Sequence, residues 1–460
     1  MGSDVGINYS NYIHTQNFNF GPHLGFALRL NDKGTLVARG GYALIYDYFG
    51  PLINPLGGSP PFVKQTTYQQ PSGAGGSLVP QLTWANAFSS VSSTGGPSQY
   101  GVAQKLQQPY HQQMNLTVEW EFLRNTAMRA TYVCNPGTHL NTPVPLNNPV
   151  PQPLAAGVPV QTIRPYQPWG TITYYETATS TNFNQLQAAV RRRFSDLTLS
   201  LDFQWTKALG LDAYNDGGVT NPLDFRHDYG NLDTYARRYA VFHHIYNLPI
   251  GTGKKLLPHA GKTLNEFVGG WRVSGVLTLR DGFPMSTSFV PIGTLGNYPT
   301  GRPNIVPGIN PINKSAVPGK NPMINVAAFC IPGLCPSDGA VLTSTGSYTM
   351  PASYDPQYCP TTLTATNCPN PASEYTYGNE QRNSMAGPGY ANYDSSLQKD
   401  SRISERVILQ LRADAFNTLN RTNFAVPSNR QINGGSTPFG ESTAIQGNAR
   451  ELQLGAKLIF

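Results

Sequence analysis

Charged residues are scarce in this sequence, and long apolar runs are missing. Asp, Glu, Lys and Arg together make up 12% of the 460 residues, about half of the roughly 25% that is usual for soluble domains. No run approaches the 18 or more apolar residues that a membrane-spanning helix needs. These two deficits argue against helical membrane proteins, coiled coils and ordinary α/β enzymes.

The excess of positive charge is small and dispersed. Lys and Arg number 32 against 25 Asp and Glu, which gives a formal net charge of +7. The longest run of cations is Arg191–Arg193, and the Lys and Arg form no stripe of the kind that binds nucleic acid. We therefore expect no nucleic-acid partner.

Cysteine is also rare, and its placement is uneven. Two close pairs, Cys330 with Cys335 and Cys359 with Cys368, lie in one polar, proline-rich region, and Cys134 stands alone. Neither spacing fits a zinc template. The pairs favour local disulfides in an oxidising compartment over free thiols, and Cys134 is interpreted as a small strand residue.

Strict alternation of apolar and polar residues is the strongest pattern that the sequence does contain. From Leu452 to Phe460, every second residue is apolar, and the same holds from Leu197 to Trp205. Successive side chains of a strand point to opposite sides, so each such segment has one apolar face. Eleven segments follow this rule, near residues 22–30, 35–47, 112–122, 127–135, 183–194, 197–209, 238–249, 271–282, 391–402, 407–419 and 449–460.

The connections between these segments alternate between short turns and long loops. The long ones are rich in Gly, Pro, Ser, Asn and Tyr and lie near residues 48–110, 136–181, 210–237, 286–390 and 421–448. Segments of 9–13 residues are long enough to cross a bilayer at a tilt, and aromatic residues gather at their ends. The pattern predicts an all-β, antiparallel transmembrane β-barrel in the outer membrane of a Gram-negative bacterium, with the long loops extracellular.

The number of strands predicts that further strands complete this barrel. Eleven antiparallel strands leave both edge strands running in the same direction, so these edges cannot pair antiparallel with each other. An open edge is not tolerated in lipid. The chain also begins at Met1 without a secretory leader. Both observations predict the C-terminal part of a longer barrel.

Seven blocks of the sequence, in order, resemble those of one family, the Oar-like TonB-dependent receptors. They are RGGYALIYDYFG (39–50), QQMNLTVEWEF with ATYVCNPGTHL (112–140), NFNQLQAAVRRRFSDLTLSLDFQWTKALG (182–210), FRHDYGNLDTYARRYAVFHHIYNLPIGTGKKL (225–256), GGWRVSGVLTLRDGFPM (269–285), RADAFNTLNRTNFAVP (412–427) and RELQLGAKLIF (450–460). Cys134 stands where the family usually has Gly.

The resemblance implies that residues 1–460 are about half of a 22-stranded barrel. It also implies a plug, an N-terminal sandwich and a TonB-contacting segment, all absent here, through which the TonB energy-coupling complex would act. The implied function is uptake or export of a large substrate, whether an iron chelate, glycan, peptide or protein. Two alternatives stay open, namely a surface adhesion or structural barrel that anchors large loops, and a passive porin.

The candidate site residues are charged side chains on the polar faces of the strands. We expect ten of them to line the lumen: Arg39, Glu119, Arg129, Arg191, Asp202, Arg272, Arg280, Arg412, Asp414 and Lys457. Alternatively, they only pair with one another as part of a polar wall. Phe460, in phase with the apolar face of the last strand, is predicted to be the signal that the barrel-assembly machinery reads.

The sequence predicts neither an enzyme nor a metal or cofactor site. No Ser/His/Asp or Cys/His set is anchored to a recognisable motif, and the aspartates between residues 212 and 233 lack EF-hand spacing. The Tyr-rich connection 286–390 is the best binding candidate, because Tyr with Gly, Ser and Asn is typical of adaptable recognition surfaces.

Overall fold

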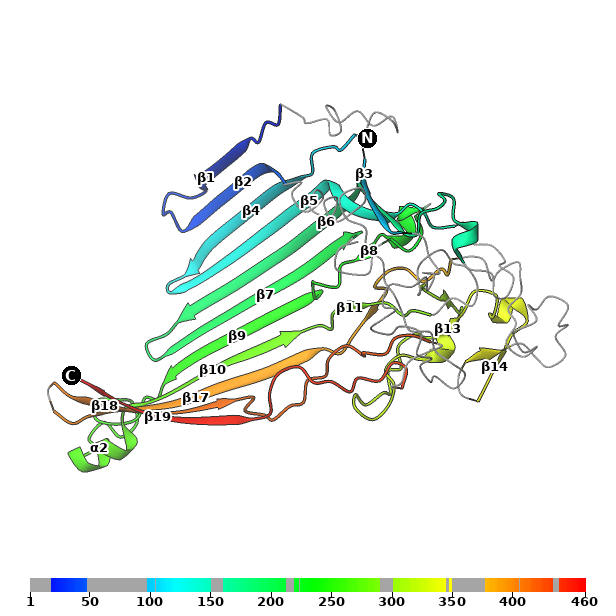
Figure 1. Ribbon diagram of the computed structural model, residues 1–460. Coiled ribbons are helices and arrows are strands. Elements are labelled where there is room, and N and C mark those ends of the chain that lie inside the picture. The colour runs from blue at the N-terminus through cyan, green and yellow to red at the C-terminus, as the bar shows by residue number, and fades with distance from the viewer. Residues whose placement is uncertain are drawn as a thin grey trace, which may run out of the picture.

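Eleven strands form one antiparallel sheet and follow one another in sequence order (Figure 1). The computed structural model describes residues 18–47, 97–103, 105–149, 160–211, 219–222, 224–289, 301–344, 347–349, 377–404, 406–432 and 438–460. The strands are β1 (His23–Arg29), β2 (Leu36–Tyr46), β4 (Tyr110–Leu123), β5 (Thr126–Pro145), β6 (Ile172–Arg193), β7 (Leu197–Gly210), β9 (Arg238–Asn247), β10 (Trp271–Arg280), β17 (Tyr390–Arg402), β18 (Ile408–Phe416) and β19 (Glu451–Ile459). The predicted all-β antiparallel fold is confirmed.

The long connections gather at one end of the sheet and the short turns at the other, as Figure 1 shows. We call these the loop end and the turn end. At the turn end, the connection between β9 and β10 carries the helix α2 (Lys262–Val268). Among the described residues, no helix is both long enough and apolar enough to span a bilayer.

Short elements occur in the connections at the loop end. They are β3 (Gln99–Val102), β8 (Gly230–Asn231), β11 (Pro284–Met285), β12 (Asn304–Ile305), β13 (Phe329–Cys330), β14 (Val341–Leu342), β15 (Tyr348–Thr349) and β16 (Met385–Ala386), with 3₁₀ turns at Val160–Ile163, Phe225–Asp228, Val326–Ala328 and Pro336–Asp338. The two-residue strand β8 pairs with the end of β7, and the other two-residue strands pair as β11 with β16, β12 with β13, and β14 with β15.

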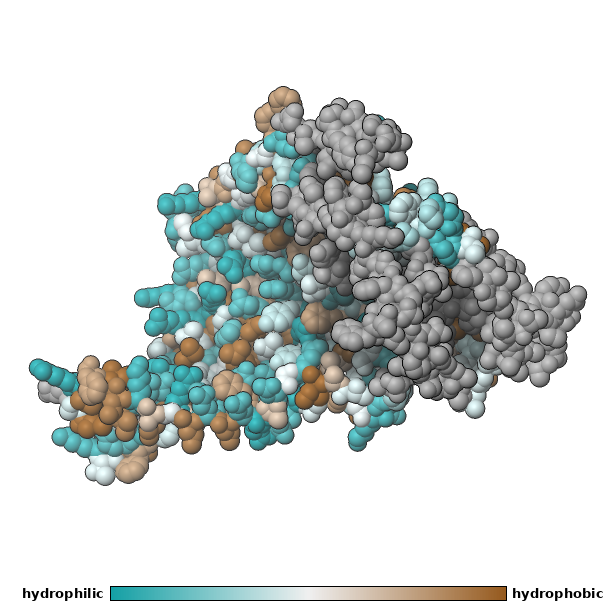
Figure 2. Space-filling view, viewed as in Figure 1, coloured by the Kyte–Doolittle hydropathy of each residue, from teal (hydrophilic) through white to brown (hydrophobic). Residues whose placement is uncertain are grey.

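The strand register keeps the apolar residues on one face across the sheet. Leu201 of β7 lies opposite Val190 of β6 and Phe242 of β9, whereas the next residue, Asp202, lies opposite Ala189 and Val241 on the other face. Leu201 is nevertheless 45% exposed. Figure 2 shows apolar side chains on the surface along its lower border, over β17 to β19. Among the described residues, no second layer covers this face, so its apolar side chains remain exposed.

Two strands are longer than the alternation predicted. β5 continues to Pro145 and β6 begins at Ile172, and β3 pairs with β6 in parallel from Gln99. The loop expected from residue 136 to 181 is therefore strand at both of its ends. The alternating pattern is lost there because both faces lie beyond the apolar band, so neither face requires apolar residues.

One glycine lets two polar rings meet on the apolar face. His244 of β9 and Tyr393 of β17 reach over Gly275 of β10, and their Nε2 and Oη atoms lie 2.8 Å apart. A Cβ atom at position 275 would lie only 2.6 Å from either group. The hydrogen bond gives each polar group a partner on a face that offers few others.

Opposite-face substitutions at neighbouring positions test the face assignment. In a reconstituted barrel, we expect Leu201→Arg to lower the free energy of unfolding by about 2–4 kcal/mol, because a cation on the lipid face near mid-membrane must leave water. Ser200→Arg is the matched control on the polar face, where the new guanidinium lies near Asp202. Equal losses from denaturant unfolding in lipid vesicles would contradict the face assignment, and a larger loss from Ser200→Arg would show that the faces are inverted.

Candidate functional site

All ten charged residues singled out in the sequence lie on one face of the sheet. The register of the neighbouring strands places on this polar face Arg39, Glu119, Arg129, Arg191, Asp202, Arg272, Arg280, Arg412, Asp414 and Lys457. Neutral polar side chains fill the positions between them. Thr117 bonds to Thr131, and Gln185 bonds to both Gln204 and Thr206.

Several of these charges already have partners on the same face. Arg39 lies 3.3 Å from the Glu119 carboxylate, and Arg412 lies 2.7 Å from Asp414. Arg272 donates to Asn247. These contacts agree with a polar wall whose members pair with one another.

A charged pocket lies on the polar face near the turn end. Its volume is about 380 Å³, and Arg39, Glu119, Glu121, Arg129 and Arg191 contribute to its lining. Within the described part of the chain, neither Arg129 nor Arg191 has an ion-pair partner. This pocket concentrates positive charge on β5 and β6.

At the loop end, parts of three connections pack into one body rather than separate loops. We call residues 219–232, 283–349, 377–389 and 421–446, as far as they are described, the loop body. Met285, Ile324 and Phe329 are buried in its apolar cluster, and Val426 and Phe439 from the last connection pack against them. The composition of these loops alone did not indicate such a core.

A buried ion pair joins two of these connections. The Nη1 atom of Arg302 lies 2.6 Å from Asp228 Oδ1, and Arg302 and Asp228 are 8% and 0% exposed. Arg302 also donates to the carbonyls of His227 and Glu380. The second Asp228 oxygen accepts from the backbone of Thr220. Because the charges and their remaining hydrogen-bonding groups are satisfied, the pair can be tolerated without water.

Glu380 is the second buried acid of the loop body. Its carboxylate accepts the backbone N–H and hydroxyl of Thr287 and the hydroxyl of Ser384. Burial raises the pKa of Glu380 to about 7, although the donors from Thr287 and the charge of Arg302 oppose the shift. Glu380 therefore changes charge near neutral pH. It was not singled out in the sequence, where an isolated acid in a weakly charged connection was the only signal.

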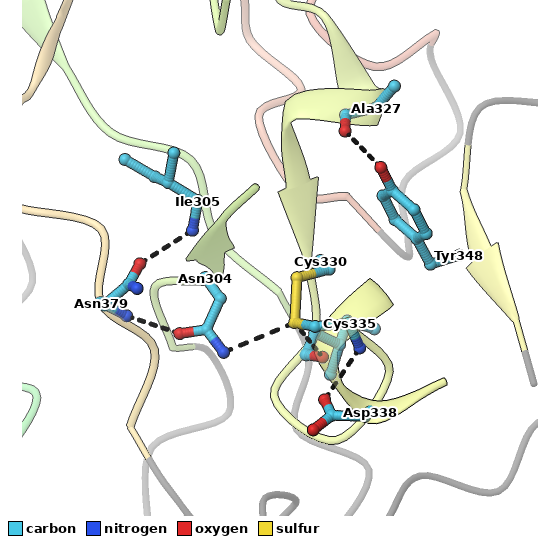
Figure 3. Close-up of a disulfide and its surroundings, with 9 residues drawn as sticks. Asn304, Ile305, Ala327, Cys330, Cys335, Asp338, Tyr348 and Asn379 are labelled. Carbon is cyan, nitrogen blue, oxygen red and sulfur yellow. Dashed lines mark hydrogen bonds between the residues drawn. A yellow bond between two sulfur atoms is a disulfide. The ribbon is translucent and has the colours of Figure 1, made fainter. Parts of the chain in front are cut away.

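A disulfide closes a tight turn within the loop body (Figure 3). Cys330 and Cys335, one of the pairs noted in the sequence, are bonded to each other. Asp338 accepts the backbone N–H of Cys335, and the side chain of Asn304 lies 3.5 Å from the Cys335 sulfur. Cys359 and Cys368 lie outside the described residues, and Cys134 is a free thiol on β5.

The remaining candidates contribute no further site. Phe460 is 90% exposed at the end of the chain. Of the aspartates in the connection 210–237, Asp228 pairs with Arg302, whereas residues 212 and 216 lie outside the described residues. No group of metal-binding side chains occurs among the residues that the structure describes.

The comparisons with known proteins identify the domain. A family described as "Outer membrane beta barrel domain" matches residues 2–453. The chain belongs to this family. No curated protein matches the chain in sequence.

Solved structures with similar folds include larger outer-membrane proteins. The chain is 10% identical to the outer membrane transporter YddB from Escherichia coli, with a TM-score of 0.43. The matched region covers 95% of this chain and 40% of the transporter. For the siderophore receptor PiuA from Acinetobacter baumannii, the identity is 9%, the TM-score 0.40, and the coverage 95% and 35%. For the FrpB iron transporter from Neisseria meningitidis, the values are 8%, 0.37, and 96% and 39%. The chain thus spans 40% or less of their lengths.

Because the chain belongs to the outer membrane β-barrel family, we conclude that membrane lipid surrounds the exposed apolar face. The domain resides in the outer membrane of a Gram-negative bacterium, and Leu201, Leu397 and Leu454 face hydrocarbon. The charged residues on the opposite face then avoid the lipid.

Breaking the buried ion pair should release the loop body without unfolding the sheet. We expect Arg302→Met to destabilise the body by about 3–5 kcal/mol, because the Asp228 charge stays buried without its partner. Hydrogen exchange should increase in residues 219–232 and 301–305 while β7 and β10 stay protected. The double variant Asp228→Asn with Arg302→Met should recover part of the loss. Unchanged exchange in the single variant would contradict this role.

The loop body should lose stability as pH rises through the neutral range. The pKa of Glu380 is about 7 in the folded protein and near 4.5 as a free side chain, so the folded state holds the proton over this interval. Its contribution is complete below pH 4.5 and is lost by pH 7, in total up to about 3 kcal/mol.

The difference between wild type and Glu380→Gln isolates this effect. His227 acts in the opposite sense, because burial and then Arg302 lower its pKa, but it is present in both proteins. Urea unfolding of the loop body between pH 5 and 8 should show a steeper loss in the wild type. Parallel pH profiles would exclude Glu380 as the titrating group.

Proposed function

We propose that this domain forms part of a large, TonB-dependent outer-membrane transporter of the Oar-like type. The observation that carries the proposal is the open sheet itself. β1 pairs only with β2, and β19 only with β18, among the described strands. Both edges need partners in hydrocarbon, and further strands that supply them make a wide barrel whose polar face encloses a passage.

The seven sequence blocks that resemble the Oar-like receptors support a transporter over a passive porin or a surface anchor. A barrel of about 22 strands without a plug would conduct ions continuously, so such a width suits a gated transporter. In this proposal the loop end faces outward, the loop body contacts a large substrate, and Phe460 marks the chain for the barrel-assembly machinery. The ten charges of the polar face then line the lumen and contact the plug.

The full-length protein distinguishes the three candidate functions. A gated transporter should show little conductance in a planar bilayer and should bind the purified periplasmic domain of TonB. Continuous conductance without TonB binding would identify a passive porin. A closed barrel that does not bind TonB would identify an anchor for surface loops, and it would overturn the proposal.

A further inference from the structure

Two extended hairpins leave the sheet at the loop end and enclose a window between them. One consists of β7 with β8 and β9, and the other of β10 with β17, continued by β11 and β16. Their last shared backbone bond runs from Asp281 to Arg238. The hairpins meet again where the side chains of Asn231 and Asn383 each donate to the backbone carbonyl of the other. The cavity between these contacts has a volume of about 710 Å³.

The lining of this window is strongly positive. Lys207, Arg237, Arg238 and Arg280 contribute four cations, against the single carboxylate of Asp281. Asp281 lies 2.8 Å from Arg238 and neutralises it. Arg280 stacks on the Phe283 ring, with its guanidinium carbon 3.9 Å from the ring centroid, and donates to Gln446.

Lys207 and Arg237 are the cations of the window that remain available. Both are exposed, and neither has an ion-pair partner in the part of the chain that the structure describes. Cations gathered around one cavity repel one another, so an anion placed among them is stabilised. The window therefore has the charge and the volume to accept an anionic group.

The window lies where the apolar band ends. Along β7, the apolar face presents Leu201, Phe203 and Trp205 and then Lys207, and Arg238 lies opposite Trp205 on the same face. Tryptophan is typical of the boundary between hydrocarbon and headgroups, and lysine directs its ammonium group outward from it. Lys207 and Arg238 are thus at the depth of lipid headgroups, and Arg237, the next residue along the chain, lines the same window.

We propose that this window binds the phosphate of an anionic lipid headgroup in the outer leaflet. Lys207 and Arg237 donate charge-assisted hydrogen bonds to the phosphate oxygens, and Trp205 contacts the upper acyl chain. The assignment of the leaflet rests on the proposed function, in which the loop end is extracellular. A soluble anion is disfavoured because Lys207 belongs to the lipid-facing side.

Native mass spectrometry of the full-length protein in neutral detergent tests the site. The probes are phosphatidic acid, phosphatidylcholine and inorganic phosphate. The wild type should retain phosphatidic acid in preference to phosphatidylcholine, and Lys207→Gln with Arg237→Gln should weaken its binding roughly tenfold or more. The control is Lys254→Gln with Lys255→Gln at the turn end, which removes two exposed cations far from the window and should bind as the wild type does.

Three results would overturn the proposal. They are equal phosphatidic acid binding by the window variant and the wild type, equal retention of both lipids, and binding of inorganic phosphate as tight as that of the lipid. The orientation of the window in the membrane is measured separately, by labelling the Lys207→Cys variant on intact cells with a membrane-impermeant maleimide. The wild-type protein, which carries the free Cys134 thiol, gives the background. Labelling places the window outside, and its absence refutes the outer leaflet. Neither result depends on TonB binding.

Discussion

The pairing of backbone groups in hydrocarbon is the constraint on which this structure depends. A membrane-embedded strand must exchange hydrogen bonds with both neighbours, because lipid offers neither donors nor acceptors. The nine inner strands satisfy this in one continuous ladder, whereas β1 and β19 each have a single neighbour among the described strands. Since the ladder fixes the register, it also determines whether each side chain lies on the lipid face or on the polar face of the sheet. A shift of one residue would turn Asp202 into lipid and Leu201 into the polar face.

This constraint explains which parts of the fold could be read from the sequence. Leu452 to Phe460 and Leu197 to Trp205 alternate because one face meets hydrocarbon, so the strands and their faces were predictable. Beyond the apolar band the requirement ends, and with it the signal. The outer parts of β5 and β6, with β3 added in parallel, therefore looked like loop. His244 and Tyr393 could be placed on strands, but their contact over Gly275 depends on the register of three of them.

The loop body was not predictable for a different reason. Arg302 and Asp228 are separated by 74 positions, and each looked like an isolated charge in a polar connection. A buried ion pair of this kind adds little net stability compared with apolar residues, because removing both charges from water costs free energy. Its effect is selective, since only one arrangement of the two connections pairs both charges. Burial of the apolar cluster around Met285 and Phe329 stabilises the loop body, and the ion pair determines which segments pack together in it.

The loop body and the window are mechanically connected through a few contacts. Asn383 and Asn231 close the far side of the window, and Asn383 lies three residues from Glu380 in the same segment of the loop body. Arg382 packs directly against Gly230, where a Cβ atom would lie 2.3 Å from the Arg382 carbonyl. Loosening of this segment must therefore alter the border of the window. Because such coupling is reciprocal, an anion held between the two hairpins would in turn stabilise the loop body above them.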